Sequence, residues 1–374
     1  MKFVISSTAF SARLQAMGRV VTPKNNVSIL ECFVFDVRDK KLTLTASDNE
    51  NTLVSVLDLV EQDGDIRFAV NAKTVQDAVK EIPEQPLEVY VNEQTMEVTV
   101  EYQNGQYRFM AQGADEFPVP PALDGDITTL SIPTESLLTG VGRELFATAD
   151  DTLRPVMNGV FFDVKVGNVT FVASDGHKLA CSTVNELQAE KEGSFILPKK
   201  PASLLKNLFS KESGDVKIQF NARSAVFSTD TATLTCRLIE GHYPNYRSVI
   251  PQGNPNEATL NRQALLSVLR RVMIFSNVNS ALVKLTFDMG SLSVSGQDIE
   301  YSMSADEKML CDYNGTPMRI GFKGPFLTDL LNNLQSEEVT IRLSDSTRAG
   351  VIVPTTQPEG EEVLMLLMPM MLND

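Results

Sequence analysis

The sequence Val172-Ala173-Ser174-Asp175-Gly176-His177-Lys178-Leu179-Ala180 sets the pattern that the rest of the chain repeats. The alternating residues before it, 168–171, predict a half-buried strand. Asp175-Gly176 predicts a turn, because glycine accepts a positive φ without steric cost. Weaker copies occur at 42–48 and 292–298, and their aspartates lie 127 residues before and 123 residues after Asp175. That spacing is close to one third of the 374 residues and indicates three copies of one domain.

Other landmarks recur at nearly the same spacing. Each third opens with a short strand, a polar turn and a helix, and the strands are anchored at Ile5, Ile132 and Leu260. Ser, Thr and Asn at these turns are typical helix N-caps. A second helix begins near Lys73, Lys199 and Lys323. Each third ends at an aromatic or methionine residue followed by proline: Phe117-Pro118, Tyr243-Pro244 and Met368-Pro369.

The repeat predicts an α+β fold of three domains, 1–125, 126–248 and 249–374. We expect two helices and about eight strands in each domain, with Pro-rich linkers at 117–121 and 251–255. Residues 1–30 contain basic and no acidic side chains, as a targeting segment would. Because the repeat already begins within them, we interpret them as part of the first domain.

The composition is that of an ordinary globular protein, with 43% hydrophobic and 22% charged residues. The net charge of −15 favours solubility and, taken over the whole chain, argues against nucleic-acid binding. No apolar run is long enough to span a bilayer. None of the four cysteines (Cys32, Cys181, Cys236 and Cys311) belongs to a CxxC pair. We therefore expect reduced, structural thiols in a cytoplasmic protein.

Six predicted helical segments differ in charge from the rest of the chain. They contain 14 basic and 5 acidic residues, so the remaining residues carry a net charge of −24. Helices could simply hold solvated Lys and Arg, but glutamate is an equally good helix former. The interpretation we favour is a basic helical surface inside an acidic shell, suited to bind a phosphate backbone without sequence preference. The segments are 7–24, 71–82, 134–147, 199–211, 261–274 and 323–334.

The sequence offers little support for an enzyme. Its only histidines are His177 and His242, and it has no GxxxxGK[ST] loop, HExxH motif or nucleophile elbow. Asp175 and His177 could form an acid–base pair, but the two copies have Glu50 and Glu300 where His177 stands. We therefore expect no catalytic residue, no metal site and no cofactor, and we interpret His177 as a structural or binding side chain.

The C-terminal run 363–372 is apolar almost throughout. Its first part predicts a buried final strand. Residues after Pro369 cannot readily continue a central strand, because proline lacks the N–H group that a sheet ladder needs. Flexible methionine side chains near a surface suit a groove that accepts peptides.

Four motifs, taken in order and at their spacing, resemble those of the bacterial sliding clamps, the beta subunits of DNA polymerase III. They are Met1-Lys2-Phe3, 174–180, Tyr243-Pro244-Asn245-Tyr246-Arg247 and Met368-Pro369-Met370, and the resemblance covers the whole chain. It implies two chains joined head to tail in a closed ring, with helices lining the hole and sheets forming the rim. The implied function is to encircle duplex DNA without sequence preference, as a non-catalytic processivity factor. The alternative is a monomeric three-domain scaffold that binds proteins without encircling DNA; an enzyme is a more distant third.

The resemblance also implies three groups of site residues. A pocket between the second and third domains would bind short peptide motifs of the polymerase III catalytic subunit, the clamp loader, other polymerases and repair proteins. It would use Arg154, Met157, Ser174, Gly176, His177, Lys178, Leu179, Pro244, Val249, Leu366, Met368, Pro369 and Met370. The DNA-facing residues would be Lys24, Lys73, Lys199, Lys200 and Lys323. The homodimer contact would set Tyr107 and Phe109 of one chain against Ile274 and Phe275 of the other, unless these four residues belong to ordinary domain cores.

Overall fold

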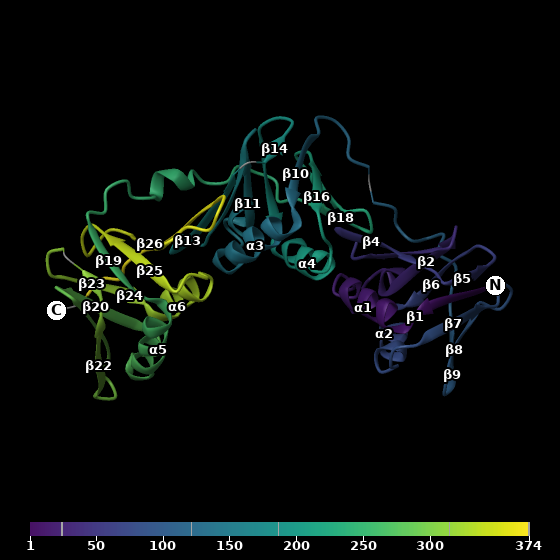
Figure 1. The fold of residues 1–374 in the computed structure, drawn as a ribbon, viewed down its shortest axis with the longest axis horizontal. Helices are drawn as coiled ribbons and strands as arrows, with labels where there is room; N and C mark the ends of the chain where they lie inside the picture. Colours follow the sequence, from purple (N-terminus) through teal and green to yellow (C-terminus); the bar gives the residue numbers. More distant parts are fainter. Residues whose placement is uncertain (24, 121, 186, 314, 373–374) are drawn as a thin grey trace. The chain divides into compact units, whose positions relative to one another are not determined.

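The computed structural model describes residues 1–23, 25–120, 122–185, 187–313 and 315–372 (Figure 1). These residues form six α-helices and 27 β-strands that pair in antiparallel sheets. Within the same ranges, no helix has both the length and the apolar character needed to cross a membrane. The helices are α1 (Ser7–Met17), α2 (Ala72–Lys80), α3 (Thr134–Glu144), α4 (Lys199–Phe209), α5 (Arg262–Val272) and α6 (Gly324–Asn332).

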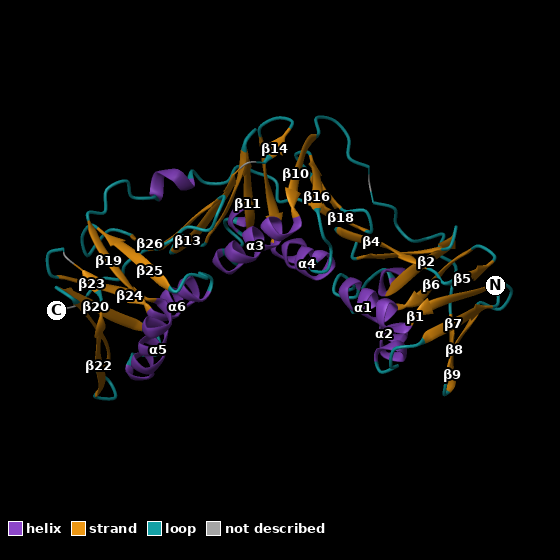
Figure 2. Ribbon diagram, viewed as in Figure 1, coloured by secondary structure: helices purple, strands orange, loops and turns teal. Residues whose placement is uncertain are grey.

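The chain divides into two compact units. The first comprises Met1–Leu138, Ala189–Lys191 and Lys200–Leu238. The second comprises Thr139–Gln188, Glu192–Lys199 and the residues from Ile239 onward. Within each unit, helices cover one face of the sheets (Figure 2).

Two sheets build the first unit. The five-stranded sheet has the order β5-β1-β7-β8-β9, and the nine-stranded sheet has the order β14-β10-β16-β17-β18-β4-β3-β2-β6. The strands of the smaller sheet are β1 (Lys2–Ser6), β5 (Glu61–Asp63), β7 (Pro86–Val91), β8 (Glu97–Tyr102) and β9 (Gly105–Met110). Those of the larger sheet are β2 (Cys32–Arg38), β3 (Lys41–Ser47), β4 (Asn51–Asp58), β6 (Ile66–Asn71), β10 (Thr128–Pro133), β14 (Gln188–Ala189), β16 (Asp215–Phe220), β17 (Ser224–Ser228) and β18 (Ala232–Arg237).

The second unit also has two sheets. One has nine strands in the order β15-β11-β12-β13-β27-β26-β25-β19-β23, and the other has four in the order β22-β21-β20-β24. The nine strands are β11 (Gly159–Val164), β12 (Asn168–Ser174), β13 (Lys178–Asn185), β15 (Gly193–Pro198), β19 (Asn256–Asn261), β23 (Asp312–Tyr313), β25 (Glu338–Leu343), β26 (Gly350–Pro354) and β27 (Glu361–Leu367). The four are β20 (Leu282–Asp288), β21 (Ser291–Asp298), β22 (Met303–Leu310) and β24 (Met318–Lys323).

The predicted three-fold repeat is present. Each third of the described chain contains two helices and nine strands: β1–β9 with α1 and α2, β10–β18 with α3 and α4, and β19–β27 with α5 and α6. The expected number of strands was about eight. Each repeat has one strand of only two or three residues (β5, β14 or β23), which is too short to give a periodic signal in the sequence.

Successive repeats are joined by their strands. The fourth strand of one repeat pairs with the ninth strand of the next, as β4 does with β18 and β13 with β27. The second repeat therefore contributes strands to both nine-stranded sheets, and the compact units do not follow the repeats. The domain boundaries 1–125, 126–248 and 249–374 stay a prediction. The fourth strand of the last repeat, β22, and the ninth strand of the first, β9, lie at sheet edges.

The helices begin where the polar turns predict. The side chains of Ser6, Asn71 and Asn261 accept backbone N–H groups at the starts of α1, α2 and α5. The first helix ends earlier than predicted, at Met17, with Gly18 as its C-cap. Its buried side chains, which include Phe10 and Leu14, follow helical spacing, but the apolar residues beyond Gly18 belong to the following turn. The sequence pattern predicts too long a helix, because apolar residues of the turn after Gly18 continue the helical spacing.

An aspartate-capped turn recurs in all three repeats, before β4, after β12 and after β21. In each, one carboxylate oxygen accepts the backbone N–H groups two and three residues later. The hydrogen bonds run to Asp48 from Glu50 (3.0 Å) and Asn51 (2.6 Å), to Asp175 from His177 (2.8 Å) and Lys178 (2.9 Å), and to Asp298 from Glu300 (3.0 Å) and Tyr301 (3.2 Å). The recurring aspartates of the sequence therefore have one local role, which is to close the turn.

Candidate peptide-binding surface and DNA-facing cations

The turn at 174–178 is held rigid by its own side chains. Asp175 binds two backbone N–H groups through Oδ1, and its Oδ2 lies 2.8 Å from the Lys178 ammonium. Burial raises the pKa of Asp175, but these donors outweigh it, so the pKa lies below its ordinary value. Gly176 has a φ of 90°, and a Cβ there would lie 3.2 Å from Nη1 of Arg154. This position therefore requires glycine.

A buried apolar cluster supports this turn from below. Leu179 on β13 pairs with Leu366 on β27, and Tyr246 packs against the same cluster. Tyr243 stacks on Phe161 of β11 with ring centroids 4.7 Å apart, which holds the start of the segment 243–250 against this sheet. Two predicted pocket residues of that segment, Pro244 and Val249, remain exposed.

The C-terminal residues leave β27 and cross between two elements of the second unit. The final strand ends at Leu367 and is buried toward its end, as predicted. Beyond it, the Met368 N–H donates to the His177 carbonyl (2.8 Å), and the Met370 N–H donates to the Gly321 carbonyl (2.8 Å). The side chain of Met368 is 43% exposed. The tail therefore lies beside the 174–178 turn and presents a methionine there.

Phe326 on α6 is a neighbour of this site that the sequence did not reveal. Its ring lies 4.2 Å from the Lys178 ammonium and 4.8 Å from that of Lys323, and the His177 ring is 6.2 Å away. Two cations over one aromatic ring form a cation–π arrangement. The only signal in the sequence was the position of Phe326, one helical turn after Lys323.

The predicted pocket residues fall into three classes of exposure. Hydrogen bonds and strand pairing bring 174–179 together with 366–370, and Arg154 approaches the same turn through an Nη2 to Asp175 carbonyl distance of 3.5 Å. Exposed are Arg154, Gly176, His177, Pro244, Val249 and Met368; half-buried are Ser174, Pro369 and Met370; buried are Met157, Lys178, Leu179 and Leu366. The buried members support the surface from below, and Lys178 is already paired with Asp175.

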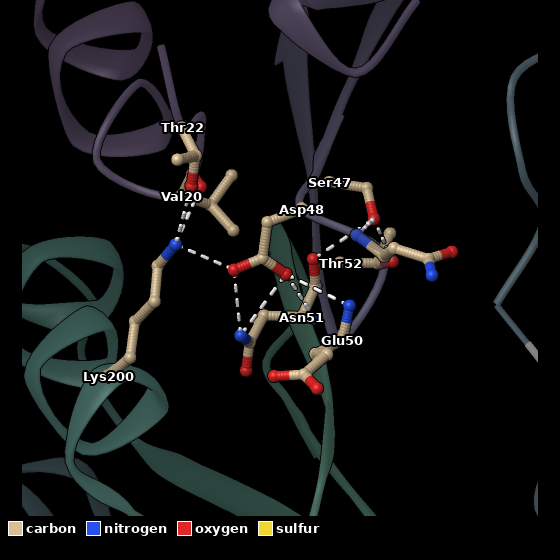
Figure 3. Close-up of polar contacts among 9 residues, drawn as sticks. Val20, Thr22, Ser47, Asp48, Glu50, Asn51, Thr52 and Lys200 are labelled. Atoms are coloured by element: carbon tan, nitrogen blue, oxygen red, sulfur yellow. Dashed lines mark hydrogen bonds and ion pairs between the residues drawn. The ribbon is translucent and has the colours of Figure 1, made fainter. Parts of the chain in front are cut away.

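The predicted DNA-facing lysines differ in how free their ammonium groups are. Lys24 lies outside the described residues. The Lys73 side chain is 84% exposed and pairs with Asp77 one helical turn away. Lys199 lies 3.1 Å from Asp150. Lys323 is half-buried against Phe326. Lys200 differs from all of these, because its ammonium is bound by three acceptors of the first repeat (Figure 3).

Three further cations lie in or beside the basic helices. Arg19, Lys206 and Arg270 are exposed in or just after helices, and none of them has an ion-pair partner in the part of the chain that the structure describes. All three belong to the basic helical segments of the sequence but match no motif. The charge of those segments is the sequence feature that points to them.

The four predicted dimer residues lie at or near sheet edges. Tyr107 is 37% exposed on β9, and its hydroxyl accepts from Tyr102. Phe109, on the same strand, lines a small apolar space with Phe10 and Phe35, so it belongs partly to the core of the first repeat. Ile274 and Phe275 follow α5 and are 70% and 37% exposed. Three of the four are thus accessible to a second chain.

The groups that could support catalysis are dispersed. His177 and His242 are both exposed, and the residues with described placement contain no cluster of three His, Cys, Asp or Glu that could hold a metal ion. Burial raises the pKa of Cys181 and of Cys236 to about 12. These thiols are therefore protonated and unreactive at neutral pH.

Three family models match successive parts of this chain. They describe the N-terminal, central and C-terminal domains of the DNA polymerase III beta subunit and match residues 1–121, 131–245 and 247–371. Together they cover almost the whole chain.

Curated relatives and solved structures agree with these matches. The beta sliding clamp of Pseudomonas aeruginosa is 29% identical over 378 residues, and that of Haemophilus influenzae is 25% identical over 365 residues; the alignments cover 98–100% of each chain. A crystal structure of the Pseudomonas aeruginosa clamp bound to griselimycin has a TM-score of 0.93 at 26% identity, with both chains fully covered. The Bacillus subtilis clamp, at 21% identity and a TM-score of 0.88, shares the fold. The chain belongs to the family of DNA polymerase III beta subunits, the beta sliding clamps, which are non-catalytic processivity factors of that polymerase.

Proposed function

We propose that two copies of this chain join head to tail into a ring that encircles duplex DNA in the cytoplasm. The ring tethers DNA polymerase III, its clamp loader, and other polymerases and repair proteins, which bind through short peptide motifs. These peptides occupy the surface formed by Arg154, 174–179, Pro244, Val249 and 366–370. Basic helices face the DNA backbone, which they bind without reading its sequence.

The observation that carries the ring is the strand pairing between repeats. The fourth strand of each of the first two repeats pairs with the ninth strand of the next repeat. By the same rule, β22, the fourth strand of the third repeat, would pair with the ninth strand of a following repeat. This chain has no fourth repeat to supply that strand. In a second copy of this chain that strand is β9, whose edge is open. A head-to-tail contact of this kind closes into a ring when its rotation permits.

Exposed apolar residues at these edges support the same contact. Tyr107 lies on β9, and Ile274 and Phe275 follow α5, which packs against β22. Apolar residues flanking an open edge are more readily explained by burial against a second chain than by solvent exposure.

The test is retention on DNA circles. The protein is loaded onto primed circular DNA with its cognate clamp loader and ATP, and the salt concentration is then raised. We expect retention on the circle and loss after the circle is cut, because a closed ring leaves only over an end. Equal retention on both forms, together with a monomer in sedimentation, would replace the ring by the monomeric protein-binding scaffold.

Charge reversal at Lys73 and Lys199 tests the DNA-facing helices. Lys73 and Asp77 form an exposed ion pair between residues one helical turn apart, and such pairs contribute little free energy. A phosphate group can therefore compete with Asp77 for Lys73. We expect Lys73→Glu with Lys199→Glu to weaken DNA binding and to make the slope of log K against log salt shallower by about 2. The measurement is a salt titration of binding to a duplex.

A matched variant controls for the change in net charge. Lys41→Glu with Lys217→Glu alters the charge by the same amount at two exposed strand lysines. We expect this control to leave the slope nearly unchanged. If both double variants shift the slope equally, the DNA path does not run along the helices.

A further inference from the structure

Lys200, at the start of α4, is bound to the first repeat by all of its donors. Its Nζ lies 2.6 Å from Oδ2 of Asp48, 3.0 Å from the carbonyl oxygen of Val20 and 3.2 Å from Oγ1 of Thr22 (Figure 3). An ammonium has three N–H donors, and here three acceptors surround it. The Lys200 side chain is 42% exposed, so a phosphate that approached it would compete with these three acceptors.

Both carboxylate oxygens of Asp48 also have hydrogen-bond or ion-pair partners. Its Oδ1 caps the turn through the N–H groups of Glu50 and Asn51, and the Asn51 side-chain amide lies 3.0 Å from Oδ2. The Asp48 side chain is only 9% exposed. Burial raises the pKa of Asp48, but Lys200 and Asn51 outweigh burial and hold it below its ordinary value. The carboxylate is therefore charged when it meets the ammonium.

The contact lies at the joint between the first two repeats. The Asp48 turn leads directly into β4, which pairs with β18 of the second repeat. A second ion pair crosses the same joint, from Arg13 on α1 to Glu212 after α4, at 3.1 Å. Lys200 therefore ties α4 to both the turn before β4 and the segment after α1. That segment carries the exposed Arg19, which is adjacent to Val20.

We propose that Lys200 is a positioning residue of this joint and not a phosphate ligand. It fixes the segment after α1 and the Asp48 turn against α4, and it acts on DNA through the placement of Arg19. This revises the DNA-binding role that the resemblance implied for Lys200. The DNA part of the inference rests on the proposed function, whereas the joint itself does not.

Two single variants separate the two roles. Lys200→Gln removes the ammonium, and Asp48→Asn keeps an acceptor for the turn but removes the charge that faces Lys200. A positioning role predicts that each lowers the thermal unfolding midpoint by about 3–6 °C. It also predicts that the double variant is no less stable than the worse single variant, because both changes break one contact. Lys206→Gln on the same helix, at an exposed lysine, is the control and should leave the midpoint unchanged.

The direction in which DNA affinity changes distinguishes the two roles. If Lys200 were a phosphate ligand, Asp48→Asn would free it and tighten binding, and Lys200→Gln would make the salt slope shallower by about 0.9. A positioning role predicts that both variants weaken binding several-fold with the slope unchanged. Tighter binding by Asp48→Asn, or independent effects of the two changes on the midpoint, would overturn the proposal. Coupled midpoints in a protein that binds no DNA would instead contradict the proposed function and leave the joint standing.

Discussion

Glu144→Gln is expected to stabilise the protein at pH 8 and to flatten the dependence of its stability on pH. Glu144, at the end of α3, is fully buried, and among the described residues neither carboxylate oxygen meets hydrogen-bond geometry with a donor. Burial raises the pKa of Glu144 well above its ordinary value, and the Ser182 hydroxyl and Arg143 offset this only partly. Arg143 is itself paired with Glu361 at 2.9 Å.

The sign of the effect follows from linkage. A carboxyl whose pKa is higher in the folded than in the unfolded state contributes fully below the unfolded pKa of about 4.3, and it loses that contribution as pH rises through the folded pKa. The contribution of Glu144 to the free energy of unfolding should therefore fall as pH rises above about 4.3. Glutamine has nearly the same shape and does not titrate. We expect the variant to be more stable than the wild type by about 1–3 kcal/mol at pH 8.

Urea unfolding at pH 5, 6.5 and 8 measures this difference. Glu135→Gln is the matched control, because Glu135 lies in the first turn of the same helix and is exposed. We expect the control to follow the wild-type profile. Parallel profiles for wild type and Glu144→Gln would mean that Glu144 is ionised in the folded protein and has a partner.

Deletion of 368–374 should abolish binding of polymerase peptides while leaving the chain folded. The deletion keeps β27, which ends at Leu367, but removes the backbone contacts of Met368 with His177 and of Met370 with Gly321. It also removes the exposed Met368 side chain beside the turn. We expect affinity for a peptide from the polymerase III catalytic subunit to fall by about 100-fold or more, which corresponds to about 2.7 kcal/mol.

Fluorescence polarisation with a labelled peptide checks the loss, and sedimentation checks the assembly. Met289→Ser removes another exposed methionine, at a turn remote in sequence from the tail, and should bind the peptide as the wild type does. Undiminished peptide affinity in the truncated chain would remove the tail from the binding surface. A truncated chain that no longer dimerises or folds would show that the tail has a structural role.

The fold could be predicted well because its information is local and repeated. Asp48, Asp175 and Asp298 marked the period, and all three close the same turn. The helix N-caps at Ser6 and Asn261 could likewise be predicted from their residue types and positions. The errors were also local. The first helix was extended beyond Gly18 by apolar residues of the following turn, and the shortest strands gave no alternation.

The site was predicted less completely, because its contacts join residues remote in sequence. Lys200 meets Asp48 across two repeats, and a sequence pattern carries no sign of which lysine is already paired. Phe326 belongs to a helix whose pattern shows only an apolar face, so its position over Lys178 could not be foreseen. The resemblance supplied the residues around 174–179 and 366–370. Their division into exposed and buried members came from the structure.

Because strand pairing holds successive repeats together, the linkers between the repeats have a different role. The β4–β18 ladder and the Thr231 carbonyl, which accepts the N–H of Val56, hold the first repeat to the second. The ion pair of Arg13 with Glu212 and the contacts of Lys200 with the first repeat add to them. Residues 118–120, which belong to the linker between the two repeats, take part in none of these contacts. In mechanical terms, the linker is a tether that raises the local concentration of one repeat near the next, while adhesion comes from the ladder. A repeat could therefore be supplied by a separate chain and still dock by the same rule.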